Sequence, residues 1–161
     1  MKTKMIAILS LAAAPVLVGC ASPVVTLDTV GPAPVKATAA TAMGHLQVYS
    51  ATETHQLAQD LYYYPHTGYR IYSASGKLVE YVPNHAAVED ETPSWVSLPA
   101  GHYLVKAQSD YYPTVMVPVD IQEGRTTEVH LNLDWKPANG ANRQVVRLPD
   151  GKAVGYREPA D

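Results

Sequence analysis

Alternation of apolar and polar residues in the second half of the chain is the feature that most limits how it can fold. Three segments show it, over residues 101–108, 114–121 and 126–133. In an extended chain, residues two apart lie on the same face, so each segment has one apolar and one polar face. The predicted inward residues are Tyr103, Val105 and Ala107, then Val115, Val117, Val119 and Ile121, then Thr127, Val129, Leu131 and Leu133. The pattern predicts β-strands that each bury one face.

Turn residues divide the rest of this region into further short strands. Ser75-Gly76 separates residues 69–74 from residues 78–82 and predicts a hairpin. Two more strands are expected over residues 46–50 and 95–98. About seven short strands then fall within residues 44–133, which favours an all-β domain built as a two-sheet antiparallel sandwich.

Two places depart from this regular pattern. Pro118 lies on the polar side of its segment and has no N–H to donate, which predicts an edge position or a bulge. Residues 52–61 are the best candidate for one or two helical turns, with Glu53 and Asp60 near their ends.

The closing half of the region resembles a known family. The runs LPAGHYLV (98–105), DYYP (110–113) and VDIQEGRTTEVHL (119–131) resemble carboxypeptidase-regulatory-like and PEGA-type sandwiches. Asp110 stands where the family has a glycine. The resemblance implies an Ig-like, transthyretin-type sandwich that serves as an accessory, binding or spacer module, without catalytic residues. Residues 134–161 follow as a loop and a C-terminal hairpin around Pro149-Asp150-Gly151, and we expect this hairpin to pack on its own domain because isolated hairpins are marginal in water.

The N-terminus has the features of an export signal. Lys2 and Lys4 precede an apolar stretch over residues 6–18 that is too short to span a membrane. The next residues, Leu17-Val18-Gly19-Cys20, resemble the bacterial lipobox. The resemblance implies a signal peptide over residues 1–19 and acylation of Cys20, which would attach the chain to membrane lipid. The alternative is a plain secretory signal with an incidental cysteine.

The residues after Cys20 bear on where the protein works. Ala21 follows the cysteine, where the family uses aspartate for retention in the inner membrane, so the resemblance implies an outer-membrane protein facing the periplasm. In a host without an outer membrane, the same signal implies the outside of the cell membrane. Residues 20–43 are rich in Ala, Thr, Pro and Val and are interpreted as a lipidated N-terminus and flexible tether. The alternative is that Val24 to Leu27 adds an edge strand to the domain.

Charge and motifs exclude several classes of function. The chain has 12 Lys and Arg against 15 Asp and Glu, and without Lys2 and Lys4 the formal charge becomes −5. There is no basic run, which argues against a nucleic-acid partner. Cys20 is the only cysteine, so no thiol remains for catalysis. Gly-x-Ser-x-Gly, Ser-x-x-Lys, His-Glu-x-x-His and phosphate-loop motifs are missing, so we expect neither enzymatic activity nor a cofactor.

Histidines and acidic residues do not form a metal motif. His45, His102 and His130 are predicted on outward faces as solvated residues, because they lack close spacing and an evident carboxylate partner. Glu89-Asp90-Glu91 lacks the alternating spacing of a calcium loop and is interpreted as a solvated acidic loop. We expect no metal site.

Tyrosines crowd one segment, from Tyr62 to Tyr72. Tyrosine combines an apolar ring with a hydroxyl and is common where proteins contact sugars or other proteins. The candidate ligand or partner surface is Tyr62, Tyr63, Tyr64, His66, Tyr69 and Tyr72. The alternative is packing, because the chain has no phenylalanine and tyrosine must also fill its core.

Together these features predict a lipid-anchored envelope protein with a non-catalytic β-sandwich. The module would bind or support another envelope protein or peptidoglycan. The alternative function is carbohydrate or peptidoglycan binding through residues 62–72.

Overall fold

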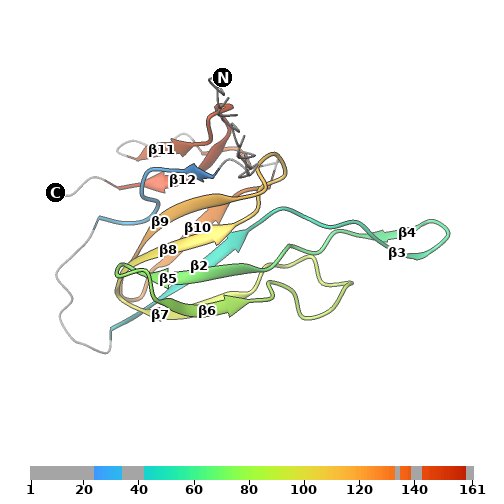
Figure 1. Ribbon diagram of the computed structural model, residues 1–161, viewed down its shortest axis with the longest axis horizontal. Helices are drawn as coiled ribbons and strands as arrows, with labels where there is room; N and C mark the ends of the chain where they lie inside the picture. The colour runs from blue at the N-terminus through green and yellow to red at the C-terminus, as the bar shows by residue number, and fades with distance from the viewer. Residues whose placement is uncertain (1–23, 34–41, 133–134, 139–142, 159–161) are drawn as a thin grey trace, which may run out of the picture.

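A computed structural model describes residues 24–33, 42–132, 135–138 and 143–158, and its regular elements are all β-strands (Figure 1). The predicted all-β class is confirmed. Within these ranges no helix has the length and apolar character needed to cross a membrane. Cys20, the predicted signal peptide and Leu133 lie outside the described residues.

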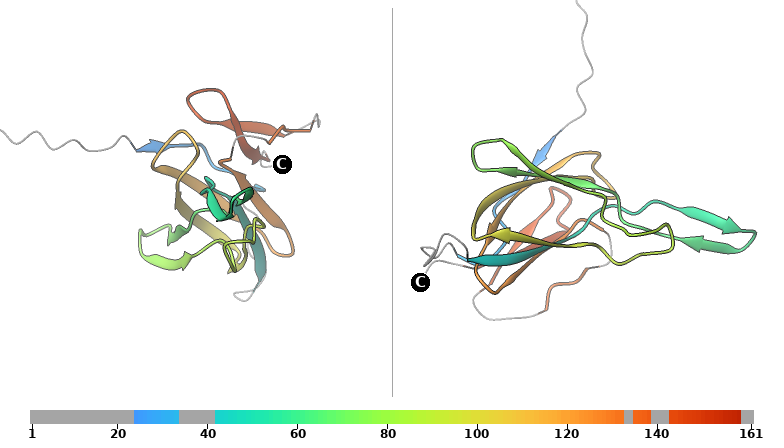
Figure 2. Two further views of the ribbon diagram at one scale, coloured as in Figure 1. Left: turned by 90° about the vertical axis from the view of Figure 1, so that its right-hand side faces the viewer. Right: turned by 90° about the horizontal axis from the view of Figure 1, so that it is seen from below.

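Two sheets face each other across one core, as Figures 1 and 2 show. The larger sheet has the strand order β1-β9-β8-β5-β6 and the smaller one β10-β2-β7. The larger sheet consists of β1 (Val25–Thr26), β5 (Tyr69–Ser73), β6 (Leu78–Val82), β8 (Gly101–Ala107) and β9 (Val115–Ile121). The smaller sheet consists of β2 (Met43–Tyr49), β7 (Trp95–Pro99) and β10 (Thr126–His130). Two further hairpins are β3 (His55–Ala58) with β4 (Leu61–Tyr63), and β11 (Gln144–Arg147) with β12 (Ala153–Arg157).

The core forms from the alternation seen in the sequence. Val115, Val117, Val119 and Ile121 of β9 are buried, and the residues between them are only partly covered. The predicted inward residues of β8 and β10 are likewise buried, except that Tyr103 is half-buried. Each fully buried valine removes its whole side chain from water, which stabilises the fold by about 1.5–3 kcal/mol.

The antiparallel part of the prediction is wrong at two places. β10 runs parallel to β2, and β1 runs parallel to β9. β9 and β10 are joined by the tight turn at 122–125, where Gly124 N–H donates to Met43 O and His45 N–H donates to Arg125 O. β10 therefore leaves this turn at the end where β2 begins, and both strands run the same way. Side-chain alternation is the same beside a parallel or an antiparallel neighbour, so the pattern carries no sign of direction.

The segment over residues 24–33 belongs to the domain. β1 pairs with β9, and Val30 N–H donates to Pro118 O at 2.9 Å. Leu27 and Val30 are buried in the core. The tether predicted over residues 20–43 is therefore wrong for this stretch, and the alternative of an added edge strand is confirmed. The reason is that β9 would otherwise expose an unpaired strand edge beside its buried valines.

Pro118 lies next to this edge rather than on it. On the side of the N-terminal segment its carbonyl accepts from Val30, and the neighbouring bond runs from Asp120 N–H to Val30 O. The missing N–H of the proline falls between the bond from Val30 N–H to Pro118 O and the bond from Leu27 N–H to Met116 O. The pairing is irregular at this point, because four steps of the N-terminal segment from Thr26 to Val30 face three steps of β9 from Met116 to Val119, so the extra residue lies beside the proline and not in β9 itself.

Residues 52–61 form strand and turn instead of helix. β3 and β4 pair antiparallel around Gln59-Asp60, and the hairpin projects beyond the end of both sheets (Figures 1 and 2). Leu57 and Leu61 stand four residues apart, a spacing that also suits one helix face, but they sit on opposite strands here. About seven strands were predicted in residues 44–133, and β3 and β4 are additional to these.

The C-terminal hairpin packs beside β10 and the N-terminal segment, as expected (Figure 1). Gly31 N–H donates to Tyr156 O at 2.8 Å, and Glu158 N–H donates to Gly31 O at 3.1 Å. A Cβ on Gly155 would stand 2.5 Å from Val30 Cγ1 and 3.0 Å from Glu128 O. Glycine at this position therefore allows β12 to lie directly against the sandwich.

Replacing Val30 tests whether the N-terminal segment contributes to the fold. Val30→Ala removes buried methyl groups and should lower the free energy of unfolding by about 2 kcal/mol. Urea denaturation of the purified protein measures this change. The control is Val24→Ala, whose side chain is exposed and whose effect should stay within about 0.5 kcal/mol. Equal effects of the two substitutions would show that residues 24–33 do not pack in the core.

Candidate functional site

The predicted tyrosine surface is divided between three environments. Tyr62 and Tyr64 lie at the β3–β4 hairpin and are 45% and 47% exposed, and Tyr63 between them is half-buried. Tyr72 is half-buried in β5. Tyr69 is 1% exposed in the core, where burial raises the pKa of its hydroxyl. The prediction is wrong for Tyr69, which fills core volume in a chain without phenylalanine.

His66 does not face a ligand either, because it is buried at the base of the hairpin. Its Nδ1–H donates to Ser50 O at 2.7 Å, and Ser50 Oγ–H donates to Thr67 O at 2.6 Å. Asn84 Nδ2 donates to Ser50 Oγ and to Val48 O, both at 2.9 Å. Buried polar groups are costly unless they are paired, so this network holds the base of the hairpin in one arrangement. His66 positions the exposed tyrosines rather than joining them.

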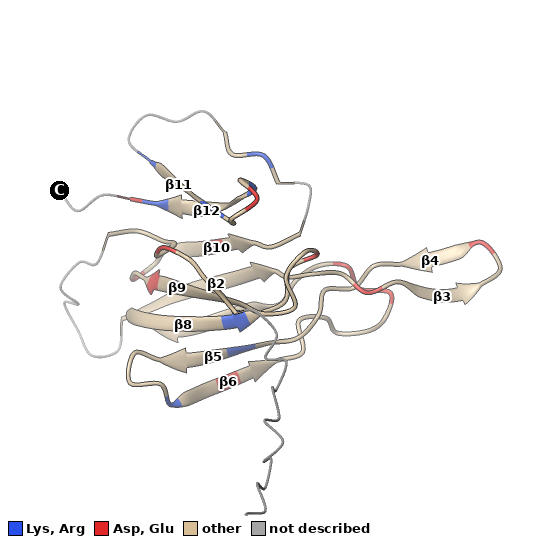
Figure 3. Ribbon diagram, turned by 45° about the horizontal axis from the view of Figure 1, so that its top comes forward, with Lys and Arg blue, Asp and Glu red and all other residues tan. Residues whose placement is uncertain are grey.

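The hairpin carries acidic residues, and its one basic side chain is His55, whose Nε2 lies 3.4 Å from a Glu53 carboxylate oxygen. Residues 51–69 contain Glu53 and Asp60 but no lysine or arginine, as Figure 3 shows. A second acidic segment contacts it, since Tyr64 N–H donates to Glu91 Oε1 at 2.7 Å. Leu57 and Leu61 are also exposed here. The candidate surface is therefore a projecting hairpin with apolar and aromatic side chains in a negative environment, which we call the tyrosine hairpin (residues 53–64).

A second candidate surface is built from a row of rings. His130 lies between Tyr49 and Trp135, with ring centroids 4.4 Å away on either side, and Tyr156 meets Trp135 edge-on at 5.3 Å. His130 was expected on a solvated outward face, and this expectation is wrong. It lies on the face opposite the core, but the rings of Tyr49 and Trp135 stack on its two sides and it is only 6% exposed.

Burial sets the protonation of this histidine. Loss of solvent lowers the pKa of His130 below its usual value near 6.5, and nearby His66 acts in the same direction. The carboxylate of Glu128, 3.5 Å from His130 Nε2, opposes this effect only in part. The ring is therefore neutral at pH 7, which suits its place in a stack.

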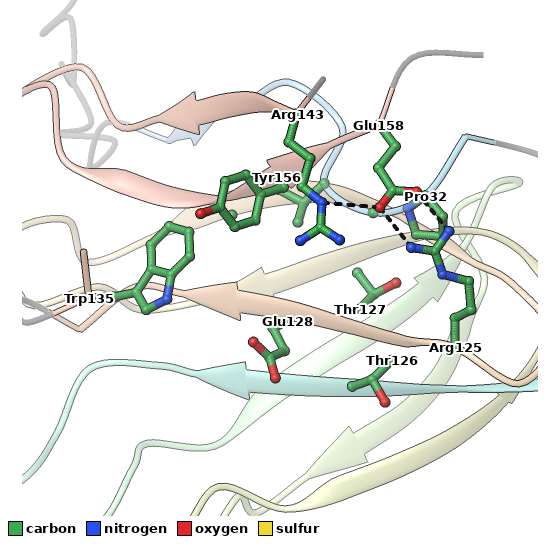
Figure 4. A pocket seen from close by; sticks show the side chains of 12 residues that line it. Pro32, Arg125, Thr126, Thr127, Glu128, Trp135, Arg143, Tyr156 and Glu158 are labelled. Carbon is green, nitrogen blue, oxygen red and sulfur yellow. Dashed lines mark hydrogen bonds and ion pairs between the residues drawn. The ribbon is translucent and has the colours of Figure 1, made fainter. Parts of the chain in front are cut away.

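A groove opens between β10 and the C-terminal hairpin, beside the same rings (Figure 4). Its volume is about 150 Å³. Its main lining side chains are Arg125, Glu128, Trp135, Arg143, Tyr156 and Glu158. In Figure 4 the end of the Arg143 side chain points toward the middle of the groove, facing Thr127 and Glu128.

Ion pairs shape one side of the groove. Both terminal nitrogens of Arg125 donate to Glu158, each at 2.7 Å, and Arg143 Nε lies 3.5 Å from the same carboxylate. The hydrogen bonds from Arg125 hold the pKa of Glu158 below its usual value. Arg143 also lies over the ring of Tyr156. The sequence carries no local sign of these residues, because Arg125 and Glu158 are 33 positions apart and only the folded hairpin joins them.

The remaining histidines are not grouped as a metal site in the described ranges. No group of three or more His, Cys, Asp or Glu side chains there is placed to hold a metal ion. His102 Nδ1 contacts Asp120 Oδ1 beside a shallow hollow of about 340 Å³. His45 contacts the hydroxyl of Ser97. A histidine–aspartate pair can orient a general base, but no described residue forms the nucleophile contact that would extend it.

The chain matches no family model, no curated protein and no solved structure. Function must therefore be argued from these surfaces.

The pKa of His130 predicts how stability changes with pH. The folded protein binds this proton less readily than the unfolded chain does, so stability should be full above about pH 6.5 and fall as the pH drops below it. His130→Phe keeps a stacking ring without a proton to bind. Its free energy of unfolding should therefore fall less between pH 7.5 and pH 5.0 than that of the unmodified protein.

Urea titrations at the two pH values measure this difference. The control is His102→Gln, which removes an exposed imidazole. An identical pH-dependent loss in the His130→Phe variant would contradict the prediction.

Proposed function

We propose that this protein is a lipid-anchored component of a bacterial envelope, attached through Cys20 and facing the periplasm from the outer membrane. Its domain would be an Ig-like sandwich of the carboxypeptidase-regulatory-like or PEGA type, acting as a non-catalytic module that binds another envelope protein. The signal-like N-terminus and the lipobox-like sequence support the anchor. The two facing sheets with one core support the sandwich assignment.

The tyrosine hairpin is the observation that carries the binding role. Leu57, Leu61, Tyr62 and Tyr64 are all between 45% and 48% exposed on a hairpin that stands clear of the sheets (Figure 1). Exposing large apolar groups away from the core brings no folding stability, whereas aromatic side chains held on a rigid support are typical contacts in protein interfaces. A polar network fixes the base of this hairpin, so it is already ordered before binding.

Carbohydrate or peptidoglycan binding is a second candidate function, and the groove favours it over residues 62–72. Arg143, Glu128 and Trp135 bring a charged donor, a charged acceptor and an indole to one small hollow. Sites for sugars combine such polar groups with aromatic walls. The scattered tyrosines of residues 62–72 offer no comparable enclosure.

Replacing Cys20 tests the anchor. We expect the mature chain to carry an acylated N-terminus and to remain with membranes, while Cys20→Ala should be released in soluble form or stay unprocessed. Membrane fractionation and intact-mass measurement report both properties, with Ser22→Ala as the control. Unchanged membrane retention of Cys20→Ala, with no acyl mass on the unmodified chain, would overturn the proposal.

Sedimentation with insoluble peptidoglycan separates the two binding functions. If the groove binds the wall, the Trp135→Ala, Arg143→Ala double variant should lose at least about 80% of the co-sedimented protein, because a charged donor and an aromatic wall are both removed. The Tyr62→Ala, Tyr64→Ala variant should then sediment normally. Equal sedimentation of all three proteins would exclude the groove as a wall-binding site.

A further inference from the structure

Two of the exposed tyrosines in the described ranges have a cation of the same chain over the ring. Four tyrosines have exposed rings in the described ranges: Tyr62, Tyr64, Tyr81 and Tyr111. The Arg70 guanidinium lies over the ring of Tyr81 at 5.3 Å. The Lys152 ammonium lies over Tyr111 at 3.8 Å and also donates to its hydroxyl.

The two tyrosines of the tyrosine hairpin differ from these. No arginine or lysine in the described ranges lies over Tyr62 or Tyr64, and the segment over residues 51–69 contains neither residue type. The negative face of an aromatic ring attracts a cation, and this attraction strengthens when the pair is shielded from water. The hairpin therefore presents two rings of the kind that the chain covers elsewhere with its own cations.

The charges around these rings also favour a positive group. Glu53 and Asp60 lie on the hairpin, where a Glu53 carboxylate oxygen is 3.4 Å from His55 Nε2, and the side chain of Glu91 accepts a hydrogen bond from the backbone N–H of Tyr64. The basic residues of the C-terminal hairpin lie on a different part of the molecule (Figure 3). Complementary charge speeds association and selects among partners.

We propose that the tyrosine hairpin binds a lysine- or arginine-bearing segment of a partner protein, with its cations over Tyr62 and Tyr64 and its charge balanced by Glu53, Asp60 and Glu91. This inference rests on the proposed function and names the chemistry of the partner. An anionic lipid surface does not fit the same hairpin, because the negative lipid headgroups would repel the acidic side chains of the hairpin. The network around Ser50 and Asn84 keeps the rings in place, so binding requires little ordering of the hairpin.

A peptide titration tests the cation chemistry directly. The probes are a fluorescent octapeptide of alternating Lys and Ser, the same peptide with Arg, and the same peptide with Gln, added to the full-length mature protein in detergent. We expect the Lys and Arg peptides to bind, and the Gln peptide to bind at least tenfold more weakly. Tyr62→Ala with Tyr64→Ala should weaken binding of the Lys peptide at least tenfold.

Two further variants separate ring faces from hydroxyls and from general charge. Tyr62→Phe with Tyr64→Phe keeps both ring faces and should retain binding within threefold, whereas Tyr111→Ala removes a ring that Lys152 already covers and should have no effect. Equal binding of the Gln peptide, or full binding by the double alanine variant, would overturn the inference. Circular dichroism of each variant shows whether the domain remains folded.

Cross-linking in intact cells distinguishes failure of this inference from failure of the proposed function. A photo-reactive residue placed at Leu61 should capture a protein, and the captured segment should contain Lys or Arg. A captured segment without either residue would overturn the inference and leave the binding role in place. If neither the photo-reactive residue at Leu61 nor one placed at Leu57 captures a protein, both proposals fail.

Discussion

Burial of one face of β9 is the interaction on which the rest of the structure depends. Val115, Val117, Val119 and Ile121 lie in the core between the two sheets, and the strand is paired on both sides. The N-terminal segment owes its place to this strand, since it supplies the partner that the outer edge of β9 lacks. The tight turn after β9 then sends β10 into the other sheet beside β2. The N-terminal segment and β10 are thus both positioned by β9, whose buried side chains lie between the two sheets.

At the end of the sandwich that carries the tyrosine hairpin, a network of buried polar groups holds the chain in place. Ser50, His66 and Asn84 join the end of β2, the start of β5 and the loop after β6 through hydrogen bonds between 2.7 and 2.9 Å. Asn84 has a φ of +72°, a conformation that asparagine tolerates better than most residues. Because leaving any of these groups unpaired would be costly, the network favours one arrangement of the chain around it. A hairpin with little apolar packing of its own can therefore project in a defined direction.

The sequence predicted the elements whose information is local. The inward residues of β8, β9 and β10 and the turns at Ser75-Gly76 and Asp150-Gly151 followed from spacing and turn chemistry. The direction of β10 could not be predicted, because side-chain alternation is the same in parallel and antiparallel strands. The burial of His130 depends on Trp135 and Tyr156, and the groove depends on the pairing of Arg125 with Glu158. These contacts join distant parts of the chain, and a single sequence contains no local signal of them.

The packing of the N-terminal segment has a consequence for where the protein can act. Val24 is the first described residue, and only residues 21–23 separate it from Cys20. Four successive Cα–Cα steps span at most about 14 Å. With a lipid on Cys20, the domain would be held next to the bilayer by this short connection. A 24-residue tether over residues 20–43 would let the domain move much farther from the bilayer. Its encounters with partners would then be confined to a thin layer along the membrane, where a shared surface raises the effective concentration of even weak binding partners.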